Sequence, residues 1–524
     1  MLNKHWREST WTDLDQSWDI IVIGGGITGA GIFNMAAQQG LQVLLLEARD
    51  FSFGTSSRSS KLVHGGIRYL RNGQFDVVRE SVKERQRLIQ ESDGLVDPLA
   101  FIFPSYEDNT HDTRMMRLAV VLYDLLAPKW QHHTLNKSQV KEILPALNQK
   151  QLIGGVEYFD ATVDDSQLVL RVIMDGIRYG GLSLNYAKVI DLPKTKKGKV
   201  IGVIVQDESG LLTPAQQELH AKVVINATGP WSDIIREKVQ GAPKLRPLRG
   251  SHLIFSSEKL PIDAAITLLH PRDNRALFAI PWESRTMIGT TDLDQHQVNL
   301  ESQITPSEVD YLLEATRYAF PQQPVTEEDI ITTFSGLRPV INTNAPTPSK
   351  ESRAHDIWEE DGLVTISGGK LTIFRVMAAD VLNFCGKWLP NTPKFDHRAP
   401  CFIHPKPHAT KADNATIWNR MAGRLGLDVN QFFAEANPAD LTPIASLHPM
   451  WAELTWAAKN EAVLHLDDLL LRRVRLGILL PDGGLNEIEK IRNLVQNELG
   501  WTHEKWFKEV ERYKDIWNRN YYLP

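Results

Sequence analysis

A dinucleotide-binding pattern near the N-terminus limits the possible folds of this chain more than any other feature. Residues 19–23 form a short, β-branched apolar run of the kind found in buried parallel strands. They lead into GGGITG at 24–29, which matches G-x-G-x-x-G. In this pattern Gly24 permits the tight turn, Gly26 lets the backbone approach a pyrophosphate, and Gly29 allows close packing of helix on strand. The sequence therefore predicts an α/β domain in which a helix over residues 27–39 binds the pyrophosphate at its N-terminus.

The residues that follow this helix complete the pattern. Residues 41–46 are predicted as a second strand, which Glu47 ends. An acidic residue about 20 positions beyond the glycines accepts hydrogen bonds from a ribose 2′-hydroxyl. Glu47 is therefore our candidate for contact with an adenosine diphosphate group that lacks a 2′-phosphate.

A second informative segment, SSRSSKLVHGGIRYL, occupies residues 56–70. Its small hydroxyl residues and glycines let the backbone come close to a bulky planar cofactor. The predicted cofactor contacts in this region are Thr55, Ser56, Ser60, Lys61, Leu62, His64, Gly65 and Gly66. Lys61, His64, Arg68 and Tyr69 add positive charge and proton-handling groups to the same segment. This combination indicates a flavoenzyme that acts on a phosphorylated or carboxylated substrate.

Length and composition exclude several other classes of protein. A chain of 524 residues can bury a large core and is expected to divide into two or more domains. The formal net charge of −6 gives no sign of nucleic-acid binding. Cys385 and Cys401 are the only cysteines, and no CxxC pair is present, so we expect neither a disulfide framework nor a thiolate metal site. The sequence predicts no metal.

No part of the sequence has the roughly 20 consecutive apolar residues that a membrane helix needs. The longest apolar run, residues 118–127, is interrupted by Tyr123 and Asp124. Residues 1–18 are charged and lack the apolar region of a secretory signal. We therefore expect a cytoplasmic protein, and association with the surface of a membrane stays open.

The order of predicted elements indicates that one domain is built from separated segments of the chain, rather than that several domains follow one another. A mainly helical stretch is predicted over 76–147, followed by strands at 153–159 and 183–189 that flank a helix over 166–179. A hairpin follows at about 199–207, and then a buried strand at 221–225. This strand ends in a turn with Ala227 and Gly229, an element common at the cofactor edge of flavoproteins with two dinucleotide folds.

The second half of the chain first becomes rich in strands and then helical. Residues 249–291 are predicted as an antiparallel sheet on the substrate side, and the chain returns through 332–340, which includes Gly336. A strand at 363–366 leads into SGGKLT at 367–372, whose backbone N–H groups are suited to a flavin ring or an anion. From this turn we expect contacts from Gly369, Lys370, Leu371 and Thr372.

The last region, residues 408–524, is predicted to be helical. Apolar residues recur there at helical spacing and form one stripe: Trp506, Phe507, Val510, Tyr513, Ile516 and Trp517. The simpler interpretation is a helix that packs on its neighbours. The alternative is a surface for a membrane or a partner protein.

Several sequence blocks resemble one enzyme family, in the expected order and over nearly the whole chain. The blocks are GGGITGAG at 24–31, TSSRSSKLVHGGIRYL at 55–70, NATGPWSD at 226–233, GSHLIF at 250–255, FAIPWESRTMIGTTD at 278–292, FSGLRPV at 334–340, SGGKLTIFR at 367–375 and DDLLLRRVRLG at 467–477. They are similar to those of the FAD-dependent glycerol-3-phosphate dehydrogenases of the aerobic, respiratory type, and of the related oxidases. The chain departs from that family at Ile373-Phe374, where Thr-Tyr is usual.

The resemblance implies that FAD oxidises sn-glycerol 3-phosphate to dihydroxyacetone phosphate. A hydride passes from C2 to flavin N5, and a base takes the hydroxyl proton. Arginine is the best donor to a phosphate dianion. The expected substrate-binding residues are Arg68, Tyr69, Arg338, Lys370 and Arg275. The expected catalytic residues are His64, His252 and Arg338. The two histidines are the candidates for proton transfer, because imidazole titrates near neutral pH.

The pattern of predicted elements divides the chain into an N-terminal segment 1–17, an FAD-dependent oxidoreductase domain 18–394, a linker 395–407 and the helical domain 408–524. Within the oxidoreductase domain, the parts that bind FAD in a Rossmann-like fold are about 18–75, 150–245 and 332–385. The antiparallel substrate subdomain is about 245–331.

The electron acceptor and the partners are less fully specified by the sequence. Quinone is the acceptor expected for a respiratory relative, which implies peripheral association with the inner face of the cell membrane. The alternatives are an oxidase that uses dioxygen, another FAD-dependent amino-acid or 2-hydroxyacid oxidoreductase of this fold, and a binding protein without catalysis. The oligomeric state also stays open, a homodimer included.

Overall fold

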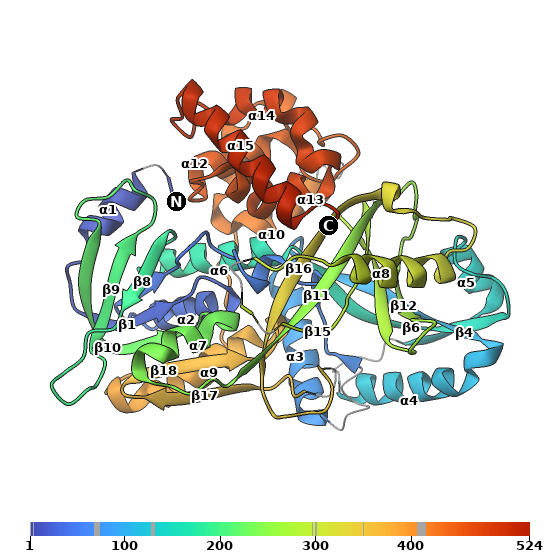
Figure 1. Ribbon diagram of the computed structural model, residues 1–524, viewed down its shortest axis with the longest axis horizontal. Coiled ribbons are helices and arrows are strands. Elements are labelled where there is room, and N and C mark those ends of the chain that lie inside the picture. Colours follow the sequence, from blue (N-terminus) through green and yellow to red (C-terminus); the bar gives the residue numbers. More distant parts are fainter. Residues whose placement is uncertain are drawn as a thin grey trace.

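The computed structural model describes residues 2–3, 5–67, 74–126, 132–295, 297–298, 301–348, 351–405 and 415–524. Two large sheets lie side by side in Figure 1, and the C-terminal helices lie together at one edge of the molecule. None of the described helices is long and apolar enough to cross a membrane.

The first sheet carries the predicted dinucleotide fold. Its strands run in the order β17-β18-β10-β1-β2-β7. Their bounds are His355–Glu360, Leu363–Gly368, Gln216–Asn226, Trp18–Ile23, Val43–Leu46 and Leu182–Leu184. All neighbours are parallel except the pair β17 and β18. The parallel strands β1 and β2 are buried on both faces, which explains their continuous apolar sequences.

Different elements pack against the two faces of this sheet. One face packs against three helices, α2 (Ile27–Gln38), α6 (Asp165–Arg178) and α9 (Phe374–Phe384). The other face packs against the antiparallel strands β8 (Ala187–Asp191) and β9 (Gly202–Asp207), with Trp11 and Leu14 of the N-terminal segment. That segment contains α1 (Trp6–Thr12), and the backbone of Leu2 bonds to Asn460 and Ala462 of the C-terminal domain.

The second sheet has ten strands and the order β15-β11-β14-β13-β12-β4-β6-β3, with β16 paired to β11 and β5 to β6. The predicted segment 245–331 supplies β11 (Leu245–Ser256), β12 (Ala265–Leu269), β13 (Ala276–Trp282), β14 (Arg285–Gly289) and β15 (Leu293–Asp294). Four strands come from outside that segment, and a fifth begins at its end: β3 (Leu62–Val63), β4 (Val96–Tyr106), β5 (His133–Asn136), β6 (Leu152–Val163) and finally β16 (Ile330–Ile341). The substrate-side sheet is therefore built from three separated parts of the chain.

The prediction of a mainly helical stretch over 76–147 is wrong in part. The stretch does contain α3 (Phe75–Glu91), α4 (Thr110–Leu126) and α5 (Lys137–Ile143), but β4 and β5 lie between them. β4 carries Pro98 and Pro104, which normally argue against a strand with two neighbours. Both prolines lie opposite β6, and β12 pairs with β4 only at Phe101 and Ile102, between them. The strand thus accommodates its prolines by limited pairing on one side.

The C-terminal domain contains α10 (Ala415–Leu425), α11 (Val429–Glu435), α12 (Trp451–Asn460), α13 (Leu476–Leu479), α14 (Ile488–Val495) and α15 (His503–Asn520). A short π-helix, Asp468–Arg473, precedes α13. The predicted linker 395–407 lies partly outside the described residues, and its Phe395 and Phe402 are buried in the same core as α2 and α9.

The aromatic stripe on α15 packs inward. Trp506, Val510, Tyr513 and Trp517 are buried in a core that this domain shares with one face of the ten-stranded sheet. Trp517 Nε1 donates to Gly477 O at 2.7 Å, and Tyr513 Oη donates to Gly483 O at 2.6 Å. Phe507 of the same stripe is 48% exposed, and Ile516 is partly buried. The interpretation as a packed helix is therefore confirmed for the four buried residues.

Candidate active site

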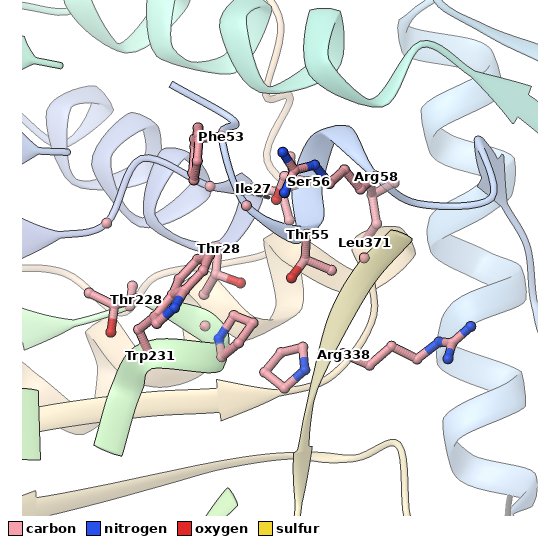
Figure 2. A pocket seen from close by; sticks show the side chains of 18 of the residues that line it. Ile27, Thr28, Phe53, Thr55, Ser56, Arg58, Thr228, Trp231, Arg338 and Leu371 are labelled. Carbon is pink, nitrogen blue, oxygen red and sulfur yellow. Dashed lines mark hydrogen bonds between the residues drawn. The ribbon is translucent and has the colours of Figure 1, made fainter. Parts of the chain in front are cut away.

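A cavity of about 710 Å³ lies between the two sheets. The turn after β1, the segment 53–64, the turn after β10, strand β16 and the turn 368–372 all line it. In Figure 2, Thr28, Thr228 and Trp231 lie together on one side, Thr55 and Ser56 lie centrally, and Arg338 of β16 lies apart from them. The cavity is therefore elongated, with chemically different groups at its two ends.

The dinucleotide turn has the geometry that its glycines predict. Gly24 has φ +112°, and a Cβ there would lie 2.6 Å from Ala227 O. A Cβ on Gly29 would lie 1.9 Å from Gly24 O, so this glycine allows α2 to begin directly against the turn. Gly26 is the N-cap of α2 and lines the cavity. The N-terminus of α2 thus presents backbone N–H groups to the cavity, where they favour an anion.

Glu47 lies beside this turn at the end of β2. Gly25 N donates to Oε2 at 2.6 Å, and Arg49 N donates to Oε1 at 2.8 Å. Burial raises the pKa of the Glu47 carboxyl, and these two N–H groups oppose the shift. Each carboxylate oxygen has a second lone pair, so a ribose hydroxyl can bind a carboxylate that the backbone already orients.

The segment that follows joins the turn to the second sheet. Ile27 N donates to Ser56 Oγ at 3.0 Å, and the Thr55 hydroxyl donates to Leu337 O. Arg58 lines the cavity and donates to Glu301 at 2.7 Å and to the Tyr521 hydroxyl at 3.1 Å. The cavity wall therefore includes a residue that is bonded directly to the C-terminal domain.

His252 of β11 lies buried at the cavity wall. Its Nε2 is 2.8 Å from Ser60 Oγ, and its ring stacks on Phe334 with centroids 4.7 Å apart. Burial, and then the charges of Arg338 and Lys61, hold the pKa of His252 well below its usual range. Within the part of the chain that the structure describes, Nδ1 has no hydrogen-bond partner. His252 is thus a neutral imidazole near neutral pH.

His64 and Lys370 meet where the segment 53–64 contacts the turn 368–372. His64 N donates to Thr372 Oγ1 at 3.2 Å, and the Thr372 hydroxyl lies 3.1 Å from His64 O. Lys370 Nζ donates to Gly65 O at 3.3 Å. Gly369 has φ +72°, the left-handed region that favours glycine, and lines the cavity with Lys370. Two distant parts of the sequence are thereby brought to one place.

Three arginines surround Asp292, which is buried at the end of the block 278–292. Arg338 Nη1 is 3.0 Å from Asp292 Oδ1, while Arg353 and Arg275 approach Oδ2 at 3.6 and 4.0 Å. Arg338 and Arg353 line the cavity. Arg353 is 5% exposed, and among the described residues neither of its terminal nitrogens has a hydrogen-bond partner. This group of cations is suited to an anionic substrate.

Arg353 is a candidate site residue that sequence reasoning missed. It follows residues 346–352, which have the composition of a surface loop, and no pattern in the sequence marks it. Only the fold brings it to Asp292, since the two residues are far apart in the chain.

The structure places most of the predicted site residues at the cavity. Those that line it are Gly24, Gly26, Glu47, Thr55, Ser56, Ser60, Leu62, His64, Ala227, Gly229, His252, Gly336, Arg338, Gly369, Lys370, Leu371 and Thr372. Those set back from it are Gly29, Lys61, Gly65, Gly66 and Arg275. Arg68 and Tyr69 lie outside the described residues.

The side chain of Lys61 is set back from the cavity. Its Nζ is fully buried and donates to Asp165 at 2.9 Å and to Ser57 O at 2.6 Å. Burial lowers the pKa of Lys61 to about 8, although Asp165 opposes this shift. The side chain therefore stands behind the cavity wall. Gly65 is also set back for a packing reason, because a Cβ there would lie 2.3 Å from the Tyr123 hydroxyl.

Comparison with known protein families matches nearly the whole chain. The family described as FAD dependent oxidoreductase matches residues 19–372, and the family described as the C-terminal domain of alpha-glycerophosphate oxidase matches residues 407–506. These two matches agree with the division between the two sheets and the C-terminal helices.

Individual relatives and a solved structure agree with the family match. The chain is 34% identical to the aerobic glycerol-3-phosphate dehydrogenase of Staphylococcus haemolyticus, over 93% of this chain and 91% of that one. It is 36% identical to that of Bacillus subtilis, over 72% and 68%. The glycerol-3-phosphate dehydrogenase from Bacillus halodurans, solved in complex with FAD, superposes with a TM-score of 0.78 over 99% of this chain and 98% of that one, at 27% identity.

The residues at the cavity fit an FAD cofactor. The tight turn at Gly24, the α2 N-terminus and Glu47 supply the groups that an adenosine diphosphate half requires. Within the described residues, Trp231 Nε1 lines this cavity without a hydrogen-bond partner, so a polar ligand can satisfy it. The predictions of an FAD cofactor and of a two-sheet α/β fold with a C-terminal helical domain are confirmed. The chain belongs to the family of FAD-dependent, aerobic glycerol-3-phosphate dehydrogenases.

Proposed function

We propose that this protein oxidises sn-glycerol 3-phosphate at its C2 hydroxyl, forming dihydroxyacetone phosphate. The observation that carries the proposal is the arginine group at Asp292. Arg353 is buried, lines the cavity and has terminal nitrogens without hydrogen-bond partners in the described structure, and Arg338 lines the cavity beside it. A phosphate dianion satisfies guanidinium groups by charge-assisted bonds.

The neighbouring groups are suited to the chemistry at C2. Bound FAD supplies a hydride acceptor at N5 for the hydrogen on C2. The proton of the C2 hydroxyl requires a base, and His252 is held neutral by burial and by Arg338. His64 is the second candidate, at the junction with Thr372 and Lys370. Loss of the hydride and of the hydroxyl proton converts the alcohol to a ketone, so the reaction balances.

A carboxylate substrate is the rival possibility for this fold. A carboxylate carries one negative charge and needs one bidentate arginine. Here Arg338 and Arg353 both line the cavity, and Arg275 stands behind Asp292. A dianion therefore matches the site better than the carboxylate of an amino acid or 2-hydroxyacid. Arg68 and Tyr69 stay predicted substrate ligands, because they lie outside the described residues.

We further propose that the electrons pass to a quinone and that the protein binds peripherally to the inner face of the cell membrane. The surface that supports this is on α4, not on α15. Along α4 the exposed apolar residues Met115, Leu118 and Leu125 follow one another at helical spacing. Exposed Arg114 and Arg117 lie on the same helix and complement anionic lipid headgroups. In Figure 1, α4 lies at the edge of the molecule opposite the C-terminal helices.

The substrate proposal is tested by initial rates with an artificial electron acceptor. Glycerol 3-phosphate is compared with glycerol, lactate and glycine at equal concentrations. We expect glycerol 3-phosphate to be turned over and the others to be poor substrates, since they lack the phosphate. Preferred turnover of lactate or glycine would instead identify a carboxylate oxidoreductase. Rapid turnover with dioxygen would favour the oxidase alternative over quinone reduction.

A further inference from the structure

A buried ion cluster joins the C-terminal domain to the cofactor-binding segment. Its centre is Asp165, the first residue of α6. The Asp165 carboxylate accepts from Ser59 N at 3.0 Å, from Ser59 Oγ at 2.7 Å and from Lys61 Nζ at 2.9 Å. Arg475 of the C-terminal domain donates to Oδ1 of the same carboxylate, to which Lys61 Nζ also donates. One side chain thus holds two parts of the fold together.

The cluster is removed from solvent. Lys61 and Asp165 are fully buried and Arg475 is 2% exposed. A buried carboxylate between two cations costs much more when one partner is lost than a surface ion pair does. The Arg475 guanidinium also bonds to Asp164 at 3.2 Å and to Leu471 O of its own domain at 2.7 Å. These bonds fix the position of the guanidinium between the two domains.

Both cations have an unusual backbone conformation. Lys61 has φ +57° and Arg475 has φ +67°, the left-handed region that side chains other than glycine seldom adopt. Such conformations persist only where the surrounding contacts fix them. For Lys61 those contacts are Asp165, Ser57 O and a backbone bond from Val163 N at 3.0 Å.

The cluster stands directly behind the cavity wall. Ser56, Arg58 and Ser60 line the cavity, and Ser57 O accepts from Lys61 and from Arg475 behind them. Lys61 Nζ is 4.9 Å from the centre of the Phe334 ring, which stacks on His252. A shift of Lys61 would therefore move Ser60, whose hydroxyl is bonded to His252.

We propose that Arg475 is a positioning residue through which the C-terminal helical domain fixes the segment 55–62 against FAD and fixes the Ser60–His252 hydrogen bond. The positioning of FAD rests on the family to which the chain belongs. The effect of Arg475 on turnover, tested below, rests on the proposed function. The C-terminal domain is accordingly part of the active centre, although Arg475 does not line the cavity.

A second contact from the same domain reaches this segment. Tyr521, just beyond α15, bonds to Arg58 through its hydroxyl at 3.1 Å. Its backbone carbonyl accepts from Thr333 N at 2.8 Å on β16, next to Phe334. The domain therefore holds the segment 55–62 at two points, which supports a positioning role.

The experiment compares Arg475→Met with Arg171→Met in full-length protein. Arg171 of α6 is equally buried and donates to Gly423 O of the C-terminal domain at 2.8 Å, but it does not touch the segment 55–62. We measure the dissociation constant of FAD for the apoprotein, the visible circular dichroism of bound flavin, the melting temperature and the steady-state constants. The first two readouts need no substrate, so they are independent of the proposed function.

For Arg475→Met we expect FAD affinity about tenfold weaker or more, an altered flavin circular dichroism, and kcat lowered about 100-fold, a loss typical of misplaced groups. The KM for glycerol 3-phosphate should change much less. Arg171→Met should lose stability while it keeps the flavin spectrum and FAD affinity of the parent. Equal effects of the two substitutions on FAD affinity and spectrum would overturn the proposal.

If Arg475→Met does not fold, Arg475→Lys gives the deciding result. It keeps a charge near Asp165 but lacks the planar guanidinium that bonds to Asp164, Asp165 and Leu471 O together. Weaker FAD binding with an altered flavin spectrum supports the positioning role. Parent affinity and parent spectrum in this variant would overturn it. Failure of the parent itself to oxidise glycerol 3-phosphate would instead count against the proposed function alone.

Discussion

Arg338 Nη1 lies 3.0 Å from Asp292 Oδ1, although Arg338 is on β16 and Asp292 follows β14. The same carboxylate is 3.6 Å from Arg353. Asp292 therefore holds arginines from separate strands and loops at one end of the cavity. The guanidinium groups are therefore held in position before a substrate binds, and this reduces the free-energy cost of ordering these side chains on binding.

Replacement of Arg353 by Met should mainly raise the KM for glycerol 3-phosphate. Phosphate binding is largely equal in the ground state and the transition state, so kcat should change little. Loss of a charge-assisted bond should cost about 2–3 kcal/mol, or roughly 30- to 160-fold in kcat/KM. The control is Arg272→Met, an arginine on the surface paired with Glu314. If activity with free glycerol falls as much as activity with glycerol 3-phosphate, Arg353 does not bind the phosphate.

Replacement of Gly26 by Val should give a folded protein without colour. A Cβ at Gly26 meets only the Ser56 side chain, with Oγ at 3.1 Å and Cβ at 3.9 Å, so the apoprotein can accommodate it. The side chain would instead occupy the space that a pyrophosphate needs beside α2. Flavin absorbance after purification and the melting temperature of the apoprotein check this. A yellow Gly26→Val protein would contradict the placement of the pyrophosphate.

The depressed pKa of His252 predicts a pH dependence of stability. The pKa of His252 in the folded protein lies below the unfolded value of about 6.5. At a pH between these two values, the unfolded chain therefore binds more protons than the folded protein. The contribution of neutral His252 to stability is present above pH about 6.5 and is lost as the pH falls below it. Urea midpoints of the parent and of His252→Asn, measured from pH 5 to 8, should converge toward the acid end of this range. Parallel curves would show that His252 is not held neutral by the fold.

Replacement of Leu118 and Leu125 by Gln should weaken binding to anionic vesicles. Each leucine that enters the membrane interface contributes about 1.5–3 kcal/mol, so loss of both should reduce partitioning roughly 100-fold or more. The control is Leu211→Gln, an exposed leucine between β9 and β10. Vesicle flotation measures the binding. Equal flotation of the double variant and the control would exclude α4 as the membrane surface.

The dinucleotide turn could be predicted because its requirements are local. Gly29 packs against Gly24, and Glu47 accepts from Gly25, so these residues of one βαβ unit form the expected turn, although the close contact of Gly24 is with the distant Ala227 O. The strand β4 could not be predicted in this way, because Pro98 and Pro104 are tolerated only through the limited pairing with β12.

The arginine group and the role of Lys61 were also beyond sequence reasoning. Arg353 acquires its function from Asp292, and Lys61 from Asp165, each through contacts between distant parts of the chain. Similarly, the spacing of Trp506 and Trp517 predicts a stripe on a helix, but it does not say what covers that stripe. The burial of Trp506 and Trp517 in the core shared with the ten-stranded sheet decides the question for these two residues.

The most direct test of the substrate assignment is the flavin spectrum of the purified protein without oxygen. One equivalent of glycerol 3-phosphate should bleach the absorbance of oxidised flavin, because the hydride of C2 and its electrons pass to bound FAD. The same amount of free glycerol should leave the spectrum unchanged, since Arg338 and Arg353 then have no phosphate to bind. A flavin that is bleached by dithionite but not by glycerol 3-phosphate would contradict the account.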